Sequence, residues 1–542
     1  MKFKYIFLLC ALTSTLMLSS CMEFLREDPK TIRVVDNFWQ TEADAELALN
    51  SVYFGGFPFL FNTAGGGWEP LATMYNGIIS GFFYDRREDR PFSTEVQQGN
   101  FNLPSLTVEA GRLWHELFTG VNRANLVIYH IPQMTDVLSD AQIASFTAEA
   151  RFFRALNYFK LVKNFGDVPH FETPFLGAEG LMIPRTPSIE VYRAIEHDLL
   201  TAIPSLPNTT FYQNAGRVTR PMAQTLLAKI YLQWAGFPVN GGNEIYTRAV
   251  AMARQVINGG SGHALIHPNG TTPDLNSAFN LIRTAKRGTY GAVEIIYARE
   301  FNQTLTTGNA NTQHRRAIDL ADGPGVFHIN PATYYGYLPS LVLVNSYHPD
   351  DIRGMNQQFF FRYFTTTNAR GVDSTFTVAA IGNWFWWDED ALRRGIVSSN
   401  NIPIFRFADV LLIAAEGLAR TGDYANARGY LNQVRRRARA PENTTDTGVE
   451  LVHAILTERF HEFPLEHRLF DDIRRTRLYP EADGMHSGRL RWVPLAQARI
   501  QNRPLEGQAT VGYLPEFALL WPIPQREMQA NTAFVGQQNP GW

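Results

Sequence analysis

Apolar residues recur at spacings of three and four along several stretches of the first half of the chain, and this is the period of one face of an α-helix. Thr219 and Pro221 stand where one stretch begins, which is typical of a helix start, because threonine caps helices and proline fits the first turn. Gly259 follows the last stretch and marks a helix end. We therefore expect helices over residues 113–128, 141–165, 219–231 and 245–257.

The second half of the chain repeats this pattern in two adjoining stretches. One apolar stripe runs from Ile404 to Leu418 and ends at Thr421-Gly422-Asp423, and a second runs from Ala427 to Ala438. The string AAEGLARTGDYANARGYLN resembles a tetratricopeptide unit, in which two short helices pack across a tight turn. We interpret the helical stretches as scaffold that carries no chemistry.

The segment that lies between the two helical parts has a different residue pattern. From about 260 to 402, short β-like runs such as 293–298 and 358–364 alternate with clusters of glycine, asparagine, threonine and proline. Residues 55–105 and 480–515 are similarly rich in loops. Long irregular insertions on a rigid scaffold are where binding usually occurs. No low-complexity linker separates these parts, so we expect one α-rich domain.

The first residues form a leader. Lys2 and Lys4 precede an apolar run from Tyr5 to Leu18, which is too short and too polar to span a membrane and is typical of a secretory signal. The ending Leu18-Ser19-Ser20-Cys21 resembles a bacterial lipobox, in which the cysteine is lipidated and becomes the new N-terminus. We therefore expect residues 1–20 to be a lipoprotein signal peptide and Cys21 to be a lipid anchor.

Composition excludes several classes of function. The 542 residues are 45% hydrophobic and 18% charged, which describes a folded chain, and the net charge of −2 gives no basic excess for nucleic acid. Cys10 and Cys21 are the only cysteines, so the body holds no disulfide, no cysteine-ligated metal and no thiol nucleophile. The chain has only seven lysines, none of which follows a glycine, and so contains no Walker A loop.

Motifs for catalysis are weak. His461-Glu462 suggests a zinc protease helix, but the next histidine is His467, six residues on, whereas such a helix needs histidines four residues apart. Acidic pairs such as Asp471-Asp472 are plentiful, and a glycosidase needs two carboxylates across a sugar, but the sequence does not show their separation. We predict no metal site, no cofactor and no enzymatic activity, and we keep a surface glycosidase as an alternative.

Clusters of aromatic residues in the irregular regions are more informative. Flat rings stack on the apolar faces of sugars and also suit peptide recognition, while polar neighbours bind hydroxyl groups. The alternative interpretation is that the rings fill a core beneath long loops. We predict a binding surface formed by Trp68, Tyr75, Tyr334, Tyr335, Trp384, Trp386 and Trp387.

Seven segments, in order, carry a resemblance to a known family. They are the FLREDP segment after Cys21, TEADAELALNSVY, AEARFFRALNYFKLVKNFGDVP, GRVT followed by AQTLLAKIYL, PIFRFADVLLIAAE, ERFHEFPLEHRLFDDIRR, and the closing LLWPIPQREMQAN with GQQNPGW. Together they resemble the SusD/RagB family of outer-membrane nutrient-binding lipoproteins of Bacteroidetes. The resemblance covers essentially all of residues 21–542, except for the long middle insertion.

The resemblance implies a fold, a location and a partner. It implies a mainly α fold, a tetratricopeptide-like helical-repeat scaffold with a large irregular region of loops and short strands, and a lipid-anchored protein on the outer membrane that is exposed at the cell surface. It implies a SusC-like TonB-dependent transporter as partner, and it leaves open whether calcium orders the loops. It further implies a structural ion-pair network formed by Glu458, Arg459, Glu466, Arg468, Asp471 and Arg475.

These observations favour a protein that binds a nutrient, most simply an oligosaccharide or polysaccharide, and delivers it to the transporter. A second hypothesis keeps the fold and makes the ligand a peptide, as in the RagB branch of the family. A purely structural scaffold that binds no nutrient is a further alternative. We expect the irregular insertion to form the ligand-binding part of a single domain spanning residues 21–542.

Overall fold

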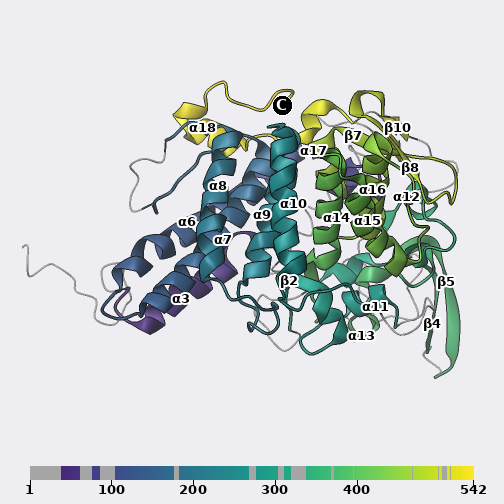
Figure 1. Ribbon diagram of the computed structural model, residues 1–542, viewed down its shortest axis with the longest axis horizontal. Coiled ribbons are helices and arrows are strands. Elements are labelled where there is room, and N and C mark those ends of the chain that lie inside the picture. The colour runs from purple at the N-terminus through teal and green to yellow at the C-terminus, as the bar shows by residue number, and fades with distance from the viewer. Residues whose placement is uncertain are drawn as a thin grey trace, which may run out of the picture.

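A row of helices forms the body of the protein (Figure 1). Successive helices lie side by side from α6 to α10, and α10 then packs on α14, which also contacts α15 and α16. The computed structural model describes residues 38–61, 76–85, 104–175, 182–267, 276–302, 311–318, 337–367, 371–394, 396–466, 468–498, 500–502, 510–512 and 514–542. The helices of the row are α3 (Glu42–Phe54), α6 (Pro104–His130), α7 (Asp140–Phe165), α8 (Ser188–Ala202), α9 (Arg220–Trp234), α10 (Gly242–Asn258), α14 (Phe407–Arg420), α15 (Tyr424–Ala438), α16 (Gly448–Glu462) and α17 (Leu469–Thr476).

The predicted helices of the scaffold are confirmed, and their ends follow the expected signals. Ser139 caps α7 with a capping box, in which its hydroxyl accepts a hydrogen bond from the backbone of Gln142. Thr219 occupies the cap position of α9 as expected, but its side chain forms no capping hydrogen bond. The stripe predicted from Ile404 begins as strand β6 (Ile402–Arg406), which runs directly into α14. Strand β6 and helix α14 are both largely buried, so the apolar residues continue from one into the other and do not mark the boundary between them.

The irregular region between residues 260 and 402 lies beneath and beside the helices. It contributes short helices and hairpins, and the β4–β5 hairpin extends from the edge of the body (Figure 1). The described strands pair as five separate antiparallel two-stranded sheets. These are β1 (Phe83–Asp85) with β3 (Tyr337–Pro339), β2 (Ile295–Arg299) with β6, β4 (Phe360–Thr367) with β5 (Asp373–Asn383), β7 (Leu478–Ala482) with β8 (Leu490–Pro494), and β9 (Ile500–Asn502) with β10 (Thr510–Gly512); the short helices are α11 (Ala278–Arg283), α12 (Leu341–Val344), α13 (Glu389–Arg394) and α18 (Gln525–Ala530).

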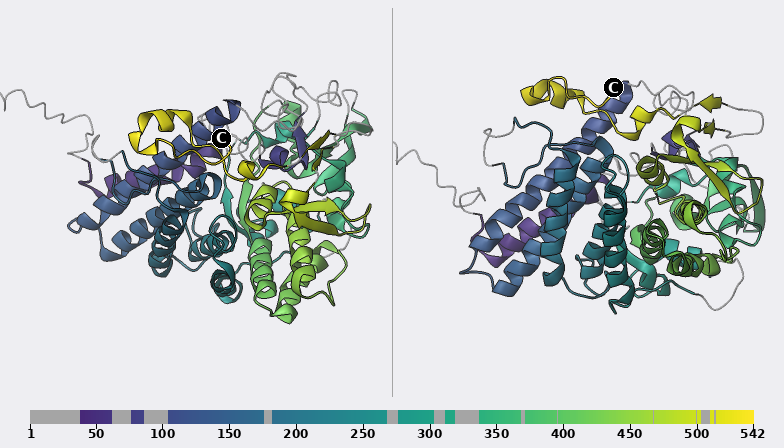
Figure 2. Two further views of the ribbon diagram at one scale, coloured as in Figure 1. Left: turned by 90° about the horizontal axis from the view of Figure 1, so that it is seen from above. Right: turned by 45° about the horizontal axis from the view of Figure 1, so that its top comes forward.

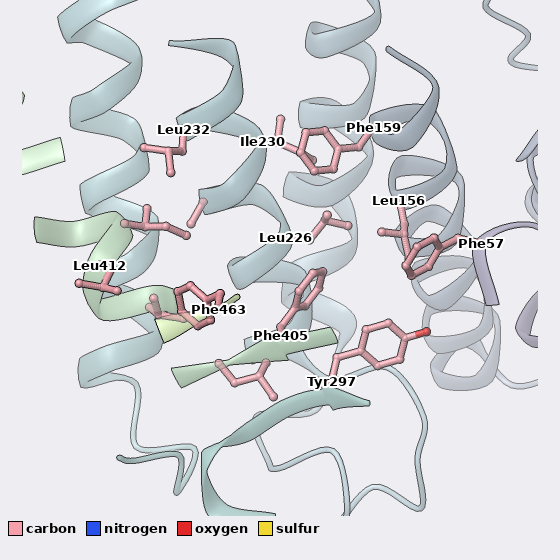
Figure 3. Packing of buried hydrophobic residues seen from close by; sticks show 14 of the residues in the cluster. Phe57, Leu156, Phe159, Leu226, Ile230, Leu232, Tyr297, Phe405, Leu412 and Phe463 are labelled. Atoms are coloured by element: carbon pink, nitrogen blue, oxygen red, sulfur yellow. The ribbon is translucent and has the colours of Figure 1, made fainter. Parts of the chain in front are cut away.

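The core is continuous from the helices into the irregular region. Figure 3 shows Leu156 and Phe159 of α7 facing Leu226 and Ile230 of α9 above the β2–β6 sheet. Tyr297 and the other rings of this sheet fill the space under the helices, and all these side chains belong to one buried cluster. Burial on this scale removes apolar surface from water and holds the insertion to the scaffold.

The C-terminal segment closes the structure by returning to the first helices. It lies across the end of the helix row (Figures 1 and 2). The backbone N–H of Trp521 donates to the carbonyl of Asn164 at 2.7 Å, and the Asn539 amide donates to the carbonyl of Phe165 at 3.0 Å. Across the described part of the chain, no helix combines the length and the apolar character needed to cross a bilayer.

The close approach of α14 to α10 gives a test of this packing. A Cβ atom on Gly417 would lie 2.5 Å from a methyl carbon of Val250, whereas a Cβ atom on Gly429 of α15 would meet nothing within 4 Å. We expect Gly417→Ala to destabilise the fold by about 1–3 kcal/mol through overpacking. The matched Gly429→Ala should stabilise it by about 0.5–1 kcal/mol, because alanine is the better helix former. Urea unfolding measures both, and changes of the same sign would contradict this packing.

Candidate functional site

Buried ion pairs join the last helices to the strands beneath them. Glu462, at the end of α16, forms ion pairs with Arg353, Arg406 and Arg437. Its Oε2 lies 3.0 Å from Nη1 of Arg353, and its Oε1 lies 2.8 Å from Nη1 of Arg406. Arg406 also binds Glu294 at 2.6 Å and Glu466 at 2.5 Å. Because these side chains are nearly or wholly inaccessible to water, each charge relies on its partners.

A second group of ion pairs surrounds Asp409, at the start of α14. Lys229 of α9 binds this carboxylate, and Arg459 and Arg468 lie 2.9 and 2.6 Å from its oxygens. Arg475 lies 2.6 Å from Glu416 and 2.7 Å from Asp472, and Lys163 of α7 lies 2.6 Å from Asp471. The structural network predicted for Glu458, Arg459, Glu466, Arg468, Asp471 and Arg475 is therefore confirmed, with Glu458 bound to Arg353 at 2.6 Å.

The pairing controls the charge of these groups. Burial opposes ionisation of Glu462, but Arg437, Arg406 and Arg353 outweigh it and lower the pKa of this carboxyl to about 2. Burial likewise opposes ionisation of Asp471, while Lys163 and Arg474 lower its pKa to about 2. These carboxylates are therefore fully charged at neutral pH.

The network predicts an acid-sensitive fold. The pKa of Glu462 is 4.5 in its ordinary state and about 2 when folded, so its stabilising effect is present above pH 4.5 and is lost as pH falls toward 2. We expect Glu462→Gln to cost about 3–5 kcal/mol at pH 7, because three buried arginines lose their shared partner. This difference from the unchanged protein should shrink in urea unfolding below pH 4.5.

The control for this prediction is Glu442→Gln, which removes an exposed carboxylate that pairs with Arg436 at 2.9 Å on the surface. Exposed pairs contribute little, so this variant should unfold like the unchanged protein at every pH. A Glu462→Gln variant with full stability at pH 7 would contradict the role assigned to the network.

A cavity with an apolar wall, called the central cavity below, lies beside this network. The space between its atoms is about 1140 Å³ when the part that opens to solvent is included, and the volume open to the centres of water molecules is about 100 Å³. Helices α7, α9 and α17, strand β6 and the segment that follows the tryptophan cluster all border it. The site therefore forms where the helical scaffold meets the irregular insertion.

Three kinds of side chain line this cavity, and each suits a different part of a polar organic ligand. Aromatic rings offer flat apolar faces, amides offer donors and acceptors, and cationic groups offer charge. The rings are Phe57, Phe61, Phe159, Phe385, Trp386 and Phe405; the amides are Gln233, Asn311, Gln313, Asn400 and Asn401; and the cations are Lys160, Lys163, Lys229, Arg283, Arg459, Arg468 and Arg475.

The three tryptophans predicted as a binding surface are buried instead. Trp384, Trp386 and Trp387 are only 5%, 6% and 3% exposed, so they do not form an open stacking surface in this structure, and their part in ligand binding stays a prediction. Trp384 and Trp387 stack on each other, with ring centroids 5.2 Å apart, because several rings meet under the β4–β5 hairpin. Only Trp386 borders the cavity, and its other face stacks on Tyr337 at 5.6 Å.

The other predicted site residues lie outside the described part of the chain. These are Trp68, Tyr75, Tyr334, Tyr335 and the proposed anchor Cys21. Their roles stay predictions.

The polar residues of the cavity were missed by the sequence analysis. The chain has only seven lysines, and three of them line this cavity. Burial disfavours the charged form of two of these lysines. It lowers the pKa of Lys163 to about 7 and that of Lys229 to about 8, although Asp471 and Asp409 act in the opposite direction. A rare residue type that recurs at 160 and 163 on one helical face was the available signal.

His461 shows no metal geometry. Its Nε2 lies 2.9 Å from the Ser346 hydroxyl, and its ring stacks on Tyr347 with centroids 4.4 Å apart. Burial lowers the pKa of this imidazole well below 6.5, so it is neutral. His467 lies outside the described residues. Within the described ranges, no group of three or more histidine, aspartate or glutamate side chains is arranged to hold a metal ion.

Paired helices that pack in a row, with an irregular insertion and a cavity between them, define a helical-repeat binding protein. Sequence comparison gives the family. A sequence model described as "SusD family" matches residues 354–542, and one described as "Starch-binding associating with outer membrane" matches residues 91–232. The chain belongs to the SusD/RagB family, as its sequence motifs indicated.

Individual relatives agree with this assignment. The chain is 25% identical over 504 residues to "SusD-like protein P2" of Formosa agariphila, covering 89% of this chain and 92% of the relative. A SusD superfamily protein from Parabacteroides distasonis shares the fold with a TM-score of 0.74 at 23% identity, covering 92% of this chain and 99% of that one. "Surface glycan-binding protein A" from Bacteroides fluxus has a TM-score of 0.68 at 20% identity, with 93% and 100% covered.

Proposed function

We propose that this protein binds a nutrient glycan in the central cavity at the outer membrane and passes it to a SusC-like TonB-dependent transporter. The observation that carries the proposal is the match of residues 91–232 to a family described as starch-binding and associated with the outer membrane. This match includes α7 and most of α9, the two helices that supply Phe159, Lys163 and Lys229 to the cavity.

The cavity wall supports recognition of a sugar. A pyranose ring has an apolar C–H face, which suits the Trp386 ring in the cavity wall, and hydroxyl groups, which suit amides. The side chain of Asn400 makes no hydrogen bond within the described residues, so both its donor and its acceptor are available. Rings beside an amide that is free to bond, here Asn400, are the composition expected for a binding site that holds a carbohydrate in orientation.

The charge state of the cavity favours binding over hydrolysis. A glycosidase needs one carboxylic acid whose pKa is raised so that it can donate a proton. Glu466 and Asp472, two of the three carboxylates that line this cavity, pair with arginines, and the third, Asp471, has its pKa lowered to about 2. Asp471 therefore carries no proton at neutral pH, and Glu466 and Asp472 are engaged by arginines, which supports a protein without catalytic activity.

The binding site can be tested on two residues that contribute differently to the fold. Trp386→Ala should weaken glycan binding by about 1–3 kcal/mol, as truncated aromatic anchors do. Asn400→Ala should weaken it by about 1 kcal/mol through one lost hydrogen bond and leave the melting temperature unchanged. Calorimetry against a panel of polysaccharides measures both, with the exposed Tyr290→Ala as the control.

Three outcomes of that experiment would contradict the proposal. If all the variants bound glycan as tightly as the unchanged protein, the ligand would bind outside this cavity. Binding of peptide pools in place of glycans would make the protein a peptide receptor of the RagB type. Turnover of a polysaccharide would make it an enzyme.

The lipid anchor gives a separate prediction. We propose that lipidation of Cys21 holds the mature chain to the outer membrane, with its folded body exposed at the cell surface. Cys21→Ala should abolish labelling by radioactive palmitate and move the protein to the soluble fraction, because a protein without its acyl chains loses membrane affinity. Cys10→Ala is the matched control, since Cys10 lies in the cleaved leader and its loss should leave labelling intact. Label on the Cys21→Ala protein would contradict the anchor.

A transporter partner is tested by purification. Detergent extraction of the tagged, anchored protein should recover a TonB-dependent barrel in constant proportion. If no such barrel were recovered, the proposed delivery to a transporter would be contradicted and only ligand binding would remain.

A further inference from the structure

One arginine of the central cavity differs from the three other arginines that line it in forming no ion pair within the described part of the chain. Arg459, Arg468 and Arg475 each lie within ion-pairing distance of two carboxylates. Arg283, the last residue of α11, forms no ion pair with any described residue, although it lines the same cavity. It is therefore a cavity charge without a direct carboxylate partner among these residues, although Asp388 acts on it from beyond ion-pairing distance.

The guanidinium of Arg283 is held firmly in place. Its Nε donates to the Asn280 side chain at 2.7 Å, and its Nη1 donates to the Trp387 carbonyl at 2.8 Å. The group also lies over the ring of Trp384, 5.2 Å from its centroid. Its Nη2 forms no hydrogen bond to any described residue and remains available to a ligand. Contacts with Trp384 and Trp387 thus hold the Arg283 guanidinium in one orientation.

The charge around the cavity is unbalanced in the same direction. Seven cationic side chains line it, against three carboxylates, and adding Asp409 and Glu416 behind the wall raises the acids to five. Burial lowers the pKa of Arg283 to about 10, with Asp388 opposing the shift, so the group stays charged at neutral pH while lacking full solvation. A buried charge without a partner is costly unless a ligand supplies the opposite charge.

We infer that the glycan bound in this cavity is acidic and that Arg283 binds its negatively charged group, a carboxylate or a sulfate. The inference rests on the proposed function and names the ligand class of the same site. A planar guanidinium with free N–H groups matches the oxygens of either anion, and the adjacent Trp386 and Asn400 hold the sugar that carries it. A neutral glycan would leave the charge of Arg283 without a counterpart.

The experiment compares acidic and neutral glycans that share a backbone. The full mature chain is titrated with oligogalacturonate and with its methyl ester, and with dextran sulfate and dextran, so that the carboxylate and sulfate arms are separate. We expect one acidic member to bind at least about tenfold more tightly than its neutral partner, as charged hydrogen bonds do, and to weaken as salt rises.

Variants assign the preference to Arg283. Arg283→Gln should lose about tenfold in affinity for the acidic glycan and bring it level with the neutral one, whereas Arg283→Lys, which keeps the charge without the planar fork, should lose less. The control is Arg193→Gln, an arginine on the exposed face of α8, which should bind as the unchanged protein does. Unchanged melting temperatures separate these effects from unfolding.

The outcomes distinguish the two levels of the proposal. Binding of a neutral glycan with equal or higher affinity overturns the acidic ligand and leaves glycan binding standing. Absence of binding to every acidic glycan in the panel also overturns the inference. Binding of polyglutamate alone, with the same dependence on Arg283, overturns the glycan function and retains an anion site. An acidic preference that Arg283→Gln leaves intact places the anion elsewhere and overturns the role of this residue.

Discussion

Two buried carboxylates organise the second half of the molecule, and each is surrounded by three cations. Glu462 ends α16, where the helix dipole disfavours a negative charge, and Arg353, Arg406 and Arg437 reverse that preference. Asp409 lies in the first turn of α14, where the dipole favours it, and Lys229, Arg459 and Arg468 converge there. Removing either carboxylate would leave three partly or wholly buried cations short of a partner. The relative positions of β6, α9, α14, α15 and α16 therefore depend on these two groups.

The same ion pairs shape the cavity, because the residues that hold the helices together also form its wall. Arg459, Arg468 and Arg475 face the cavity on one side and their carboxylates on the other. Lys163 and Lys229 connect α7 and α9 to the acids beyond them. The wall is thus fixed by charge pairing before any ligand arrives, and a preorganised site loses less freedom on binding. Arg283 and Asn400 remain as the groups whose polar atoms are not fully engaged by the protein.

The sequence predicts the scaffold well because helical periodicity is complete within a few turns of chain. Helices α7, α9, α10 and α15 follow the predicted ranges closely. The start of α14 was misplaced, since β6 and α14 are both buried and share one apolar run. The family motifs indicated that acids and bases after residue 458 form a network, but not that Arg353, Arg406 and Arg437 complete it from far along the chain.

The candidate site was harder to predict, because a ring's identity does not reveal its direction. Three tryptophans near residue 385 were equally compatible with a surface and with a core, and the structure shows two packed against each other. Which of them borders the cavity depends on the fold of the insertion around Tyr337 and Phe361. Amides such as Asn400 have no sequence pattern at all, and only the three-dimensional arrangement brings them beside Arg283.

The C-terminal segment returns to α7 and makes contacts with residues that lie far away in the sequence. Asn539 reaches the carbonyls of both Phe165 and Trp521, and Arg185 reaches Asn539, so the last residues cover the end of the first helices. The contacts of Asn539 with Phe165 and Arg185 join residues separated by more than 350 positions, and contacts of such long range form slowly. The end of α7 is therefore covered only when residues 521–539 have docked on it, so docking of this segment completes the first half of the fold.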